Sequence, residues 1–159
     1  MSAPLTQSEQ KVADALALHG LPGKVIILDQ LATTAQMAAE ALHVEVGQIV
    51  KSLCFCGVET NKPYLALVSG ANRLHETRVG RQLGEKLARA DADFVKQATG
   101  FSIGGVSPFG HPSPLEMVFD EDLLKFETIW AAAGNPRSVF QITPADLLCT
   151  TGARQMCVT

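Results

Sequence analysis

The chain has 159 residues, a formal net charge of −3, 47% hydrophobic residues and 18% charged residues. These values are typical of one globular domain with a substantial buried core, so we expect a single domain over residues 1–159. The acidic balance does not favour a protein that binds long DNA across its whole surface, and DNA is not an expected partner.

Membrane insertion and disulfides are not expected either. Gly, Pro or polar residues break every apolar run well before the roughly 20 residues that a membrane-spanning helix needs. The start of the chain lacks the basic and apolar parts of a signal peptide, which predicts a cytoplasmic protein with no membrane partner. We therefore interpret the cysteines as reduced and mostly buried: Cys54, Cys56, Cys149 and Cys157.

Two helices are predicted before the first long strand. Ser8 can cap a helix over about 8–19, which carries an apolar face and ends before a glycine. Thr33 stands three residues before a glutamine, the spacing of a capping box, and this predicts a second helix over 35–42. In that helix Met37 is expected to face inward.

Strands and further helices follow without a regular βαβ rhythm or an internal repeat. Helices are expected near 76–83, after the cap Asp91, and at Thr143-Pro144, which has the signature of a cap followed by proline. The predicted fold class is α+β (mixed α/β), with a curved mixed sheet or partial barrel surrounded by helices. The predicted strands cover 24–28, 48–56, 63–69, 86–90, 115–119, 126–132 and 138–142.

Lys51 is the first candidate for chemistry, because it lies inside the apolar strand 48–56. Alternation would place it beside Leu53 and Phe55, where an ammonium group needs a partner or a function. The alternative is a packed aliphatic stem whose amine reaches the rim of the sheet. Ser52 faces the other way and could contribute through its backbone amide.

The loop 104–111 is the second candidate. Gly104 and Gly105 can adopt backbone angles closed to other residues and can bring amide groups near a ligand, while Pro108 stiffens the exit. Such a loop could bind a carbonyl oxygen or a phosphate. It could equally be an ordinary tight connection. Val106, Ser107 and His111 are weaker members of the same segment, and His111 could be a base, a donor or a structural residue.

Known catalytic motifs are missing from the sequence. The loop matches neither a P-loop nor a dinucleotide-binding glycine motif, and Ser107 lacks the second glycine of a nucleophile elbow. The four histidines are scattered and Cys-x-Cys has no second ligand cluster, so no metal and no cofactor are expected. Asp120 is interpreted as a helix cap or turn residue.

A group of basic residues gathers between positions 73 and 89. Only two glutamates oppose them, so the group is either a solvated helix face or a surface for phosphates. Its members are Arg73, Arg78, Arg81, Lys86 and Arg89.

Together these segments resemble a known family, the YbaK-like, prolyl-tRNA-synthetase-associated editing domains. The similarity runs in order through 38–44, 48–52, 99–110, 118–121 and 143–153. It implies a trans-acting deacylase that hydrolyses the ester of mischarged tRNA, most often tRNA(Pro) carrying a small wrong amino acid. A transient complex with prolyl-tRNA synthetase is a further expectation.

The resemblance also implies roles for the two candidate segments. Lys51 is the key polar residue of the pocket, and Gly104, Gly105 and Pro108 belong to the loop that contacts the aminoacyl end. No protein nucleophile is implied, because a hydroxyl or thiol of the substrate assists the attacking water. The family branch that edits Cys-tRNA(Pro) commonly carries Ser-Ala-Gly-Arg-Arg-Gly where this chain has 132–138, so the identity of the amino acid stays open. A binding module without hydrolysis, or a hydrolase of another small ester, is the alternative.

Overall fold

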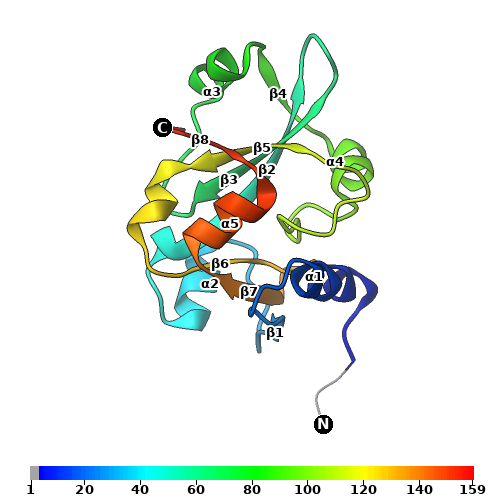
Figure 1. The fold of residues 1–159 in the computed structure, drawn as a ribbon, viewed down its shortest axis with the longest axis vertical. Coiled ribbons are helices and arrows are strands. Elements are labelled where there is room, and N and C mark those ends of the chain that lie inside the picture. The colour runs from blue at the N-terminus through cyan, green and yellow to red at the C-terminus, as the bar shows by residue number, and fades with distance from the viewer. Residues whose placement is uncertain (1–3) are drawn as a thin grey trace.

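The computed structural model describes residues 4–159 as a mixed sheet with helices against both faces (Figure 1). This confirms the predicted fold class. The helices are α1 (Gln7–Leu18), α2 (Ala35–Leu42), α3 (Glu76–Leu83), α4 (Ala92–Thr99) and α5 (Pro144–Thr151), with short 3-10 helices η1 (Val46–Gln48) and η2 (Glu121–Lys125). The strands are β1 (Ile26–Ile27), β2 (Ile49–Gly57), β3 (Pro63–Ser69), β4 (Leu87–Arg89), β5 (Glu116–Asp120), β6 (Ile129–Ala132), β7 (Ser138–Ile142) and β8 (Arg154–Met156).

The sheet is open and is ordered β1-β7-β6-β2-β3-β5-β8, with β4 added beside β2. Antiparallel pairs join β2 to β3 and β4, and β7 to β1 and β6. Parallel pairs join β2 to β6, β3 to β5 and β5 to β8. The long strand β2 therefore lies at the centre and has two partners, β6 and β4, along a single edge.

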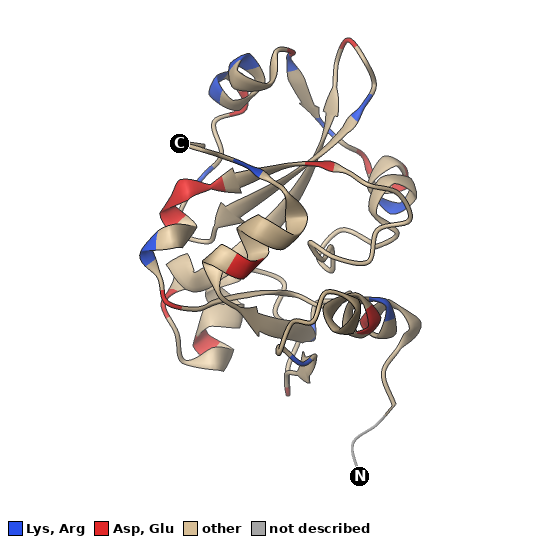
Figure 2. Cartoon of the chain, viewed as in Figure 1, with Lys and Arg blue, Asp and Glu red and all other residues tan. Residues whose placement is uncertain are grey.

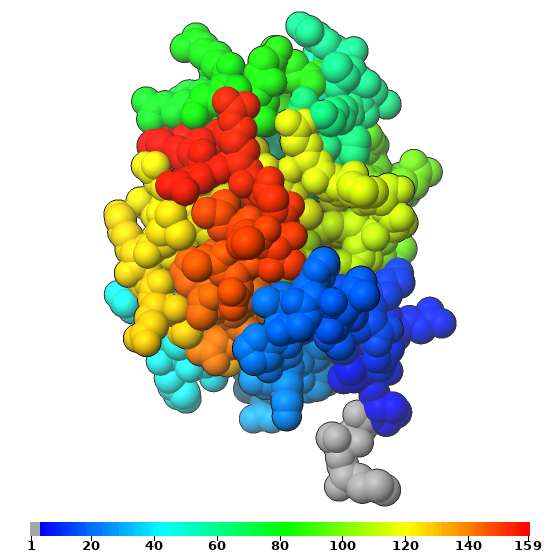
Figure 3. All heavy atoms as spheres, in the orientation of Figure 1, coloured from blue at the N-terminus to red at the C-terminus, as the bar shows by residue number. Residues whose placement is uncertain are grey.

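Hydrophobic cores form on the two faces of this sheet. The larger core joins Phe119 and Phe140 of the sheet to Val12 of α1 and Leu147 of α5. The smaller core packs Val79 of α3 against strand residues that include Phe55, Tyr64 and Val68. The C-terminal segment completes the second face, and Figure 3 shows it lying against α3. Because β2 contributes to both cores, its position is fixed from both sides.

Two helix starts differ from the prediction. Thr6, not Ser8, caps α1, because its side chain accepts from the Glu9 amide while the Glu9 carboxylate accepts from the Thr6 amide. Thr34, not Thr33, caps α2 through the Met37 amide. The predicted caps at Asp91 and Thr143 are confirmed.

Some side chains are more exposed than predicted. Met37 is 41% exposed and does not face inward, since only Ala38 and Ala39 are buried in α2. All four cysteines are free, as predicted, but none is fully buried and Cys149 is exposed. No helix within residues 4–159 is both long enough and apolar enough to cross a membrane.

Two strands are markedly shorter in the structure than predicted, and one strand was not predicted. The predicted strand 24–28 shortens to β1, which pairs only with Val139 and Ser138 at the edge of the sheet. The predicted strand 126–132 begins only at Ile129, because η2 and the residues after it occupy the preceding segment. The sequence interpretation missed β8, whose polar segment Arg154–Met156 pairs with β5.

Candidate active site

Lys51 lies in the middle of β2 beside Leu53 and Phe55, as alternation predicted, on the face that carries the smaller core. Its Nζ donates a hydrogen bond to the Asn72 carbonyl oxygen. The side chain is half-buried, and this burial lowers the pKa of Lys51, while the negative charge of Asp120 partly offsets the effect. The ammonium is therefore held in a defined position and is destabilised relative to an exposed lysine.

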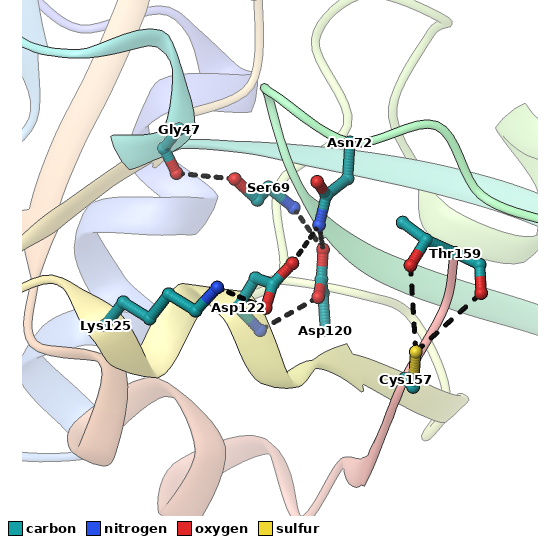
Figure 4. Close-up of polar contacts among 8 residues, drawn as sticks. All are labelled: Gly47, Ser69, Asn72, Asp120, Asp122, Lys125, Cys157 and Thr159. Atoms are coloured by element: carbon teal, nitrogen blue, oxygen red, sulfur yellow. Dashed lines mark hydrogen bonds and ion pairs between the residues drawn. The ribbon is translucent and has the colours of Figure 1, made fainter.

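A cluster of polar groups around Asp120 fixes the carbonyl that holds Lys51 (Figure 4). Oδ2 of the buried Asp120 accepts from the Ser69 amide at 3.0 Å and from Asn72 Nδ2 at 2.8 Å, and Oδ1 accepts from the Asp122 amide at 2.9 Å. Asn72 Nδ2 also donates to Asp122 Oδ2 at 2.7 Å. Asp120 does cap η2, as predicted, but it also fixes the turn after β3.

The cluster extends outward from Asp120 in both directions. Lys125 Nζ lies 3.0 Å from Asp122 Oδ1 on the exposed side. Ser69 Oγ donates to the Gly47 carbonyl oxygen at 2.7 Å on the buried side. The donors and carboxylate oxygens drawn in Figure 4 thus have partners inside the protein, which is the arrangement of a structural network.

A cavity of about 560 Å³ lies between β2, β4, β6 and the loop after α4. Its volume falls in the range of small-molecule sites, and its lining is mainly apolar. Ser52 contributes a buried side-chain oxygen that has no hydrogen-bond partner in the part of the chain that the structure describes. The lining comes from Ala32–Ala35 and Ala38, from 49–55 of β2, from Arg89, Ala90 and Val95, from Ile103, Gly104 and Val106, and from Trp130–Ala132, Asn135, Pro136, Ser138 and Val139.

The structure brings part of the glycine loop to this cavity. Gly104, with a φ of 95°, lies in the lining together with Val106. Gly105 lies behind them, where a Cβ would come within 2.6 Å of the Asn135 Cα, so a side chain would push the loop away from that segment. The Gly105 amide already donates to the Ser102 carbonyl oxygen at 3.0 Å. Gly104 and Val106 therefore supply the loop's accessible backbone.

Ser107, Pro108 and His111 do not line the cavity. Ser107 is fully buried and its Oγ accepts from the Phe109 amide at 3.2 Å. Pro108 is buried as well. His111 Nε2 lies 2.7 Å from the Ser107 carbonyl oxygen, and burial lowers the pKa of His111, which this bond partly offsets. These residues hold the shape of the loop from behind.

Sequence reasoning missed several members of the lining, because they come from segments without a recognisable motif. Trp130 and Ile103 are apolar, and Ile103 is 63% exposed. Asn135 is held by Glu9, a carboxylate that is only 5% exposed and also accepts from Ser138 Oγ. Burial alone would raise the pKa of Glu9, but these bonds and those from Thr6 lower it. The one available signal was a glutamate within the apolar stripe of α1.

A basic groove adjoins the cavity and shares Lys51, Leu53, Phe55 and Arg89 with it. The groove is further lined by 73–77, which contribute Arg73 and His75. The acidic member is Glu76, whose Oε1 lies 3.6 Å from Arg89 Nε at the surface. Figure 2 shows further basic residues on α3, so positive charge continues outward from the groove on a chain that is acidic in total.

Neither a thiolate nor a metal centre is indicated at the site. Burial, and to a smaller extent Cys56, raises the pKa of Cys54 to about 11, so the thiol in the lining is protonated near neutral pH. Within residues 4–159 no group of three or more His, Cys, Asp or Glu side chains is arranged to hold a metal ion. The polar part of the lining consists of the backbone and of the side chains of Lys51, Ser52, Arg89, Asn135, Ser138, Thr33 and Thr34.

Comparisons with known proteins agree with the resemblance seen in the sequence. A solved structure of a candidate trans-editing enzyme for prolyl tRNA synthetase is similar over 98% of this chain and 99% of its own, with a TM-score of 0.92 and 44% identity. YwhH of Bacillus subtilis (strain 168), an uncharacterized protein, is 32% identical over 114 residues, which is 72% of each chain. EbsC of Enterococcus faecalis (strain ATCC 700802 / V583), a candidate Cys-tRNA(Pro)/Cys-tRNA(Cys) deacylase, is 25% identical over 122 residues, 76% of this chain and 74% of EbsC. The model of the aminoacyl-tRNA editing domain matches residues 29–149, and the chain belongs to that family.

Proposed function

We propose that this chain is one editing domain over residues 1–159 that hydrolyses the ester of mischarged tRNA in trans. The tRNA(Pro) that carries a small non-cognate amino acid is the proposed substrate. The observation that carries the proposal is the junction at Lys51, where an apolar cavity of about 560 Å³ meets a basic groove. The apolar cavity can hold the aminoacyl group, and the basic groove can hold the phosphates next to it.

The proposed reaction is attack of water on the ester carbonyl. Water adds a hydroxyl to the carbonyl carbon, the bond to the ribose oxygen breaks, and that oxygen takes a proton as the free amino acid leaves. The ammonium of Lys51 and the amides of Gly104 or Val106 would stabilise negative charge on the carbonyl oxygen. Gly105 and Pro108 would act by shaping the loop, because the Gly105 amide is already bonded to Ser102.

The proton transfers are assigned to the substrate. Neither a carboxylate nor a histidine is among the described residues that line the cavity, and the Cys54 thiol is protonated near neutral pH. The family resemblance implies that a neighbouring ribose hydroxyl of the terminal adenosine assists. That hydroxyl can position the water and relay its proton, accepting one proton from the water while giving its own to the departing ribose oxygen. The protein then contributes mainly orientation and electrostatic stabilisation.

The basic groove gives the tRNA a direction of approach. Arg73, His75 and Arg89 lie next to Lys51, where the phosphates that precede the terminal nucleotide would pass. This favours the phosphate-binding interpretation of the basic residues over a merely solvated helix face. A transient complex with prolyl-tRNA synthetase, which releases the mischarged tRNA, is part of the proposal.

A panel of charged tRNA(Pro) tests the function. Ala, Cys, Ser, Thr, 2-aminobutyrate and Pro would each be attached, and the loss of ester would be followed with and without the protein. We expect hydrolysis of at least one small non-cognate ester and no hydrolysis of Pro-tRNA(Pro). Binding of the panel without faster hydrolysis would instead support the alternative, a module that recognises the aminoacyl end.

The variant Lys51→Ala tests the site within the same assay. We expect turnover to fall about 100-fold or more, because oxyanion-stabilising groups have effects of that order. Lys62→Ala is the matched control, since Lys62 is an exposed lysine in the hairpin turn that pairs with Glu116. Normal turnover by a folded Lys51→Ala variant would contradict the proposed role.

A further inference from the structure

Pairing along β2 is interrupted on one edge only. The strand pairs with β3 continuously from Val50 to Cys56. On the opposite edge it pairs with β6 only at Ile49 and Val50, and with β4 only from Phe55 to Gly57. Residues 51–54 therefore have a neighbouring strand on one side and an opening on the other.

Two hydrogen bonds show which backbone groups face this opening. The Gly57 amide donates to Lys62 on the β3 side at 2.9 Å, and the Val58 amide donates to Lys86 on the β4 side at 2.9 Å. Because both backbone groups of a residue in an antiparallel strand point to the same edge and alternate along the chain, the even-numbered residues face the opening. Ser52 and Cys54 are those residues.

The polar groups in the opening lack protein partners. The Cys54 carbonyl lies next to Phe55, the first residue of β2 that pairs with β4. The other three groups lie between the residues that pair with β6 and those that pair with β4: the Ser52 amide, the Ser52 carbonyl and the Cys54 amide. Outside the strand ladders, no hydrogen bond to these groups occurs within residues 4–159. Ser52 Oγ is likewise unpartnered and buried at the same place. Unpaired polar groups at the wall of a cavity are available to a ligand.

The shape of the opening selects the kind of ligand. It spans four residues, roughly 13 Å of strand, and β4 and β6 close it at the two ends. An added peptide strand would collide with both, whereas a compact planar group can enter edge-on. Trp130, Ile103 and Val106 supply apolar surface around it.

The Ser52 carbonyl and the Cys54 amide are an acceptor and a donor next to each other. The Watson–Crick edge of adenine offers the complementary pair, an N6 donor beside the N1 acceptor. We propose that the open edge of β2 binds the adenine base of the 3′-terminal nucleotide of tRNA, with the Ser52 carbonyl accepting from N6 and the Cys54 amide donating to N1. This assignment rests on the proposed function, because tRNA is the ligand that brings a terminal adenosine to this cavity.

Non-hydrolysable substrate analogues test the adenine contact without relying on turnover. 3′-Alanylamino-3′-deoxyadenosine would be compared by calorimetry with its purine counterpart, which lacks N6, and with its 7-deaza counterpart, which keeps the whole Watson–Crick edge. We expect the purine compound to bind about tenfold more weakly, because the Ser52 carbonyl loses its donor, and the 7-deaza compound to bind normally. Equal affinity of all three would overturn the inference.

A pair of variants tests the protein side of the same contact. Cys54→Pro removes an amide that points away from β3, whereas Cys54→Ala keeps it. We expect only the proline variant to lose about tenfold in affinity for the adenosine analogue. If that variant does not fold, the analogue series decides the matter alone.

The two proposals can fail separately. Preference for the adenine analogue without hydrolysis of any charged tRNA would leave the adenine site standing and remove the deacylase. Hydrolysis of charged tRNA with equal binding of the adenine and purine compounds would do the reverse. If removing the α-amino group weakens binding and removing N6 does not, the edge holds the amino acid and the adenine assignment is wrong.

Discussion

The buried polar groups around Asp120 and those around Ser52 differ in whether the protein satisfies them. Asp120 is 1% exposed and accepts three hydrogen bonds, from the last residue of β3, from the turn that follows and from the start of η2. Ser52 Oγ is buried without a hydrogen-bond partner among residues 4–159, and the backbone beside it faces an open stretch of β2. The first region maintains the fold, and the second is left for a ligand.

Lys51 connects the two regions. Its Nζ is held by the Asn72 carbonyl of the Asp120 cluster, yet the residue lines both the cavity and the basic groove. The satisfied cluster thus positions a cation beside unsatisfied groups. Variants around Asp120 are therefore expected to change mainly the stability of the fold. Variants around Ser52 are expected to change mainly the binding of substrate.

The largest effect is expected for Asp120→Asn. An amide has one acceptor oxygen where the carboxylate has two, so at least one of the three donors loses its partner inside the core. We expect a loss of about 3 kcal/mol in the free energy of unfolding, measured by urea denaturation. Asp29→Asn is the control, because Asp29 is exposed and lies outside the cluster, and we expect little change. Equal stability of the two variants would contradict a structural role for the cluster.

The same variant is expected to shift the pH dependence of turnover. Burial lowers the pKa of Lys51 below its ordinary value of 10.5, and the negative charge of Asp120 partly offsets this lowering. Turnover that requires the ammonium is present below the folded pKa of Lys51 and is lost as the pH rises through it. Asp120→Asn removes the opposing charge, so this loss should occur at lower pH. A turnover that increases with pH through this window would identify Lys51 as a base instead.

A smaller effect is expected on the outer side of the turn that Asp120 fixes. Arg73 lies in the basic groove and forms no ion pair with a carboxylate within residues 4–159. Arg73→Glu should raise the KM for charged tRNA about tenfold and reduce the salt dependence of binding, while kcat changes little.

Lys24→Glu makes the same change in net charge outside both the cavity and the groove. We expect its KM to stay near that of the unaltered protein. If both variants bind tRNA equally weakly, the effect is one of net charge, and the groove is not the path of the phosphates.

The sequence predicted the fold class and the elements that carry strong local signals. Alternation identified β2, and Asp91 and the Thr143-Pro144 pair marked the starts of α4 and α5 correctly. Local signals failed where two similar residues compete, as for Thr33 and Thr34, or where pairing with a distant strand decides, as for β8. Those outcomes depend on tertiary contacts that no short window contains.

The candidate site was also predictable only where a local signal in the sequence marks it. Lys51 could be selected because a charge in an apolar strand is unusual. Gly105 does not act as a free amide donor, because its amide already bonds to Ser102 and its Cα packs closely against Asn135. Both contacts exist only in the folded loop, so the sequence did not indicate them. The opening at Ser52 could not be anticipated at all, since it results from β4 and β6 ending at different points along β2.

The smallest change in KM is expected from one chemical change made in both regions, Ser52→Ala and Ser69→Ala. Ser69 is 2% exposed, and its Oγ donates to the Gly47 carbonyl oxygen at 2.7 Å, so its loss leaves a buried acceptor unpaired. We expect Ser69→Ala to lower the free energy of unfolding by about 1–2 kcal/mol and to leave the KM nearly unchanged. Ser52→Ala removes a hydroxyl that has no hydrogen-bond partner in the described part of the chain, so stability should stay the same or increase slightly while the KM rises about threefold. Urea denaturation and turnover assays on both variants measure this contrast. A destabilised Ser52→Ala variant with unchanged KM would mean that Ser52 belongs with the structural groups.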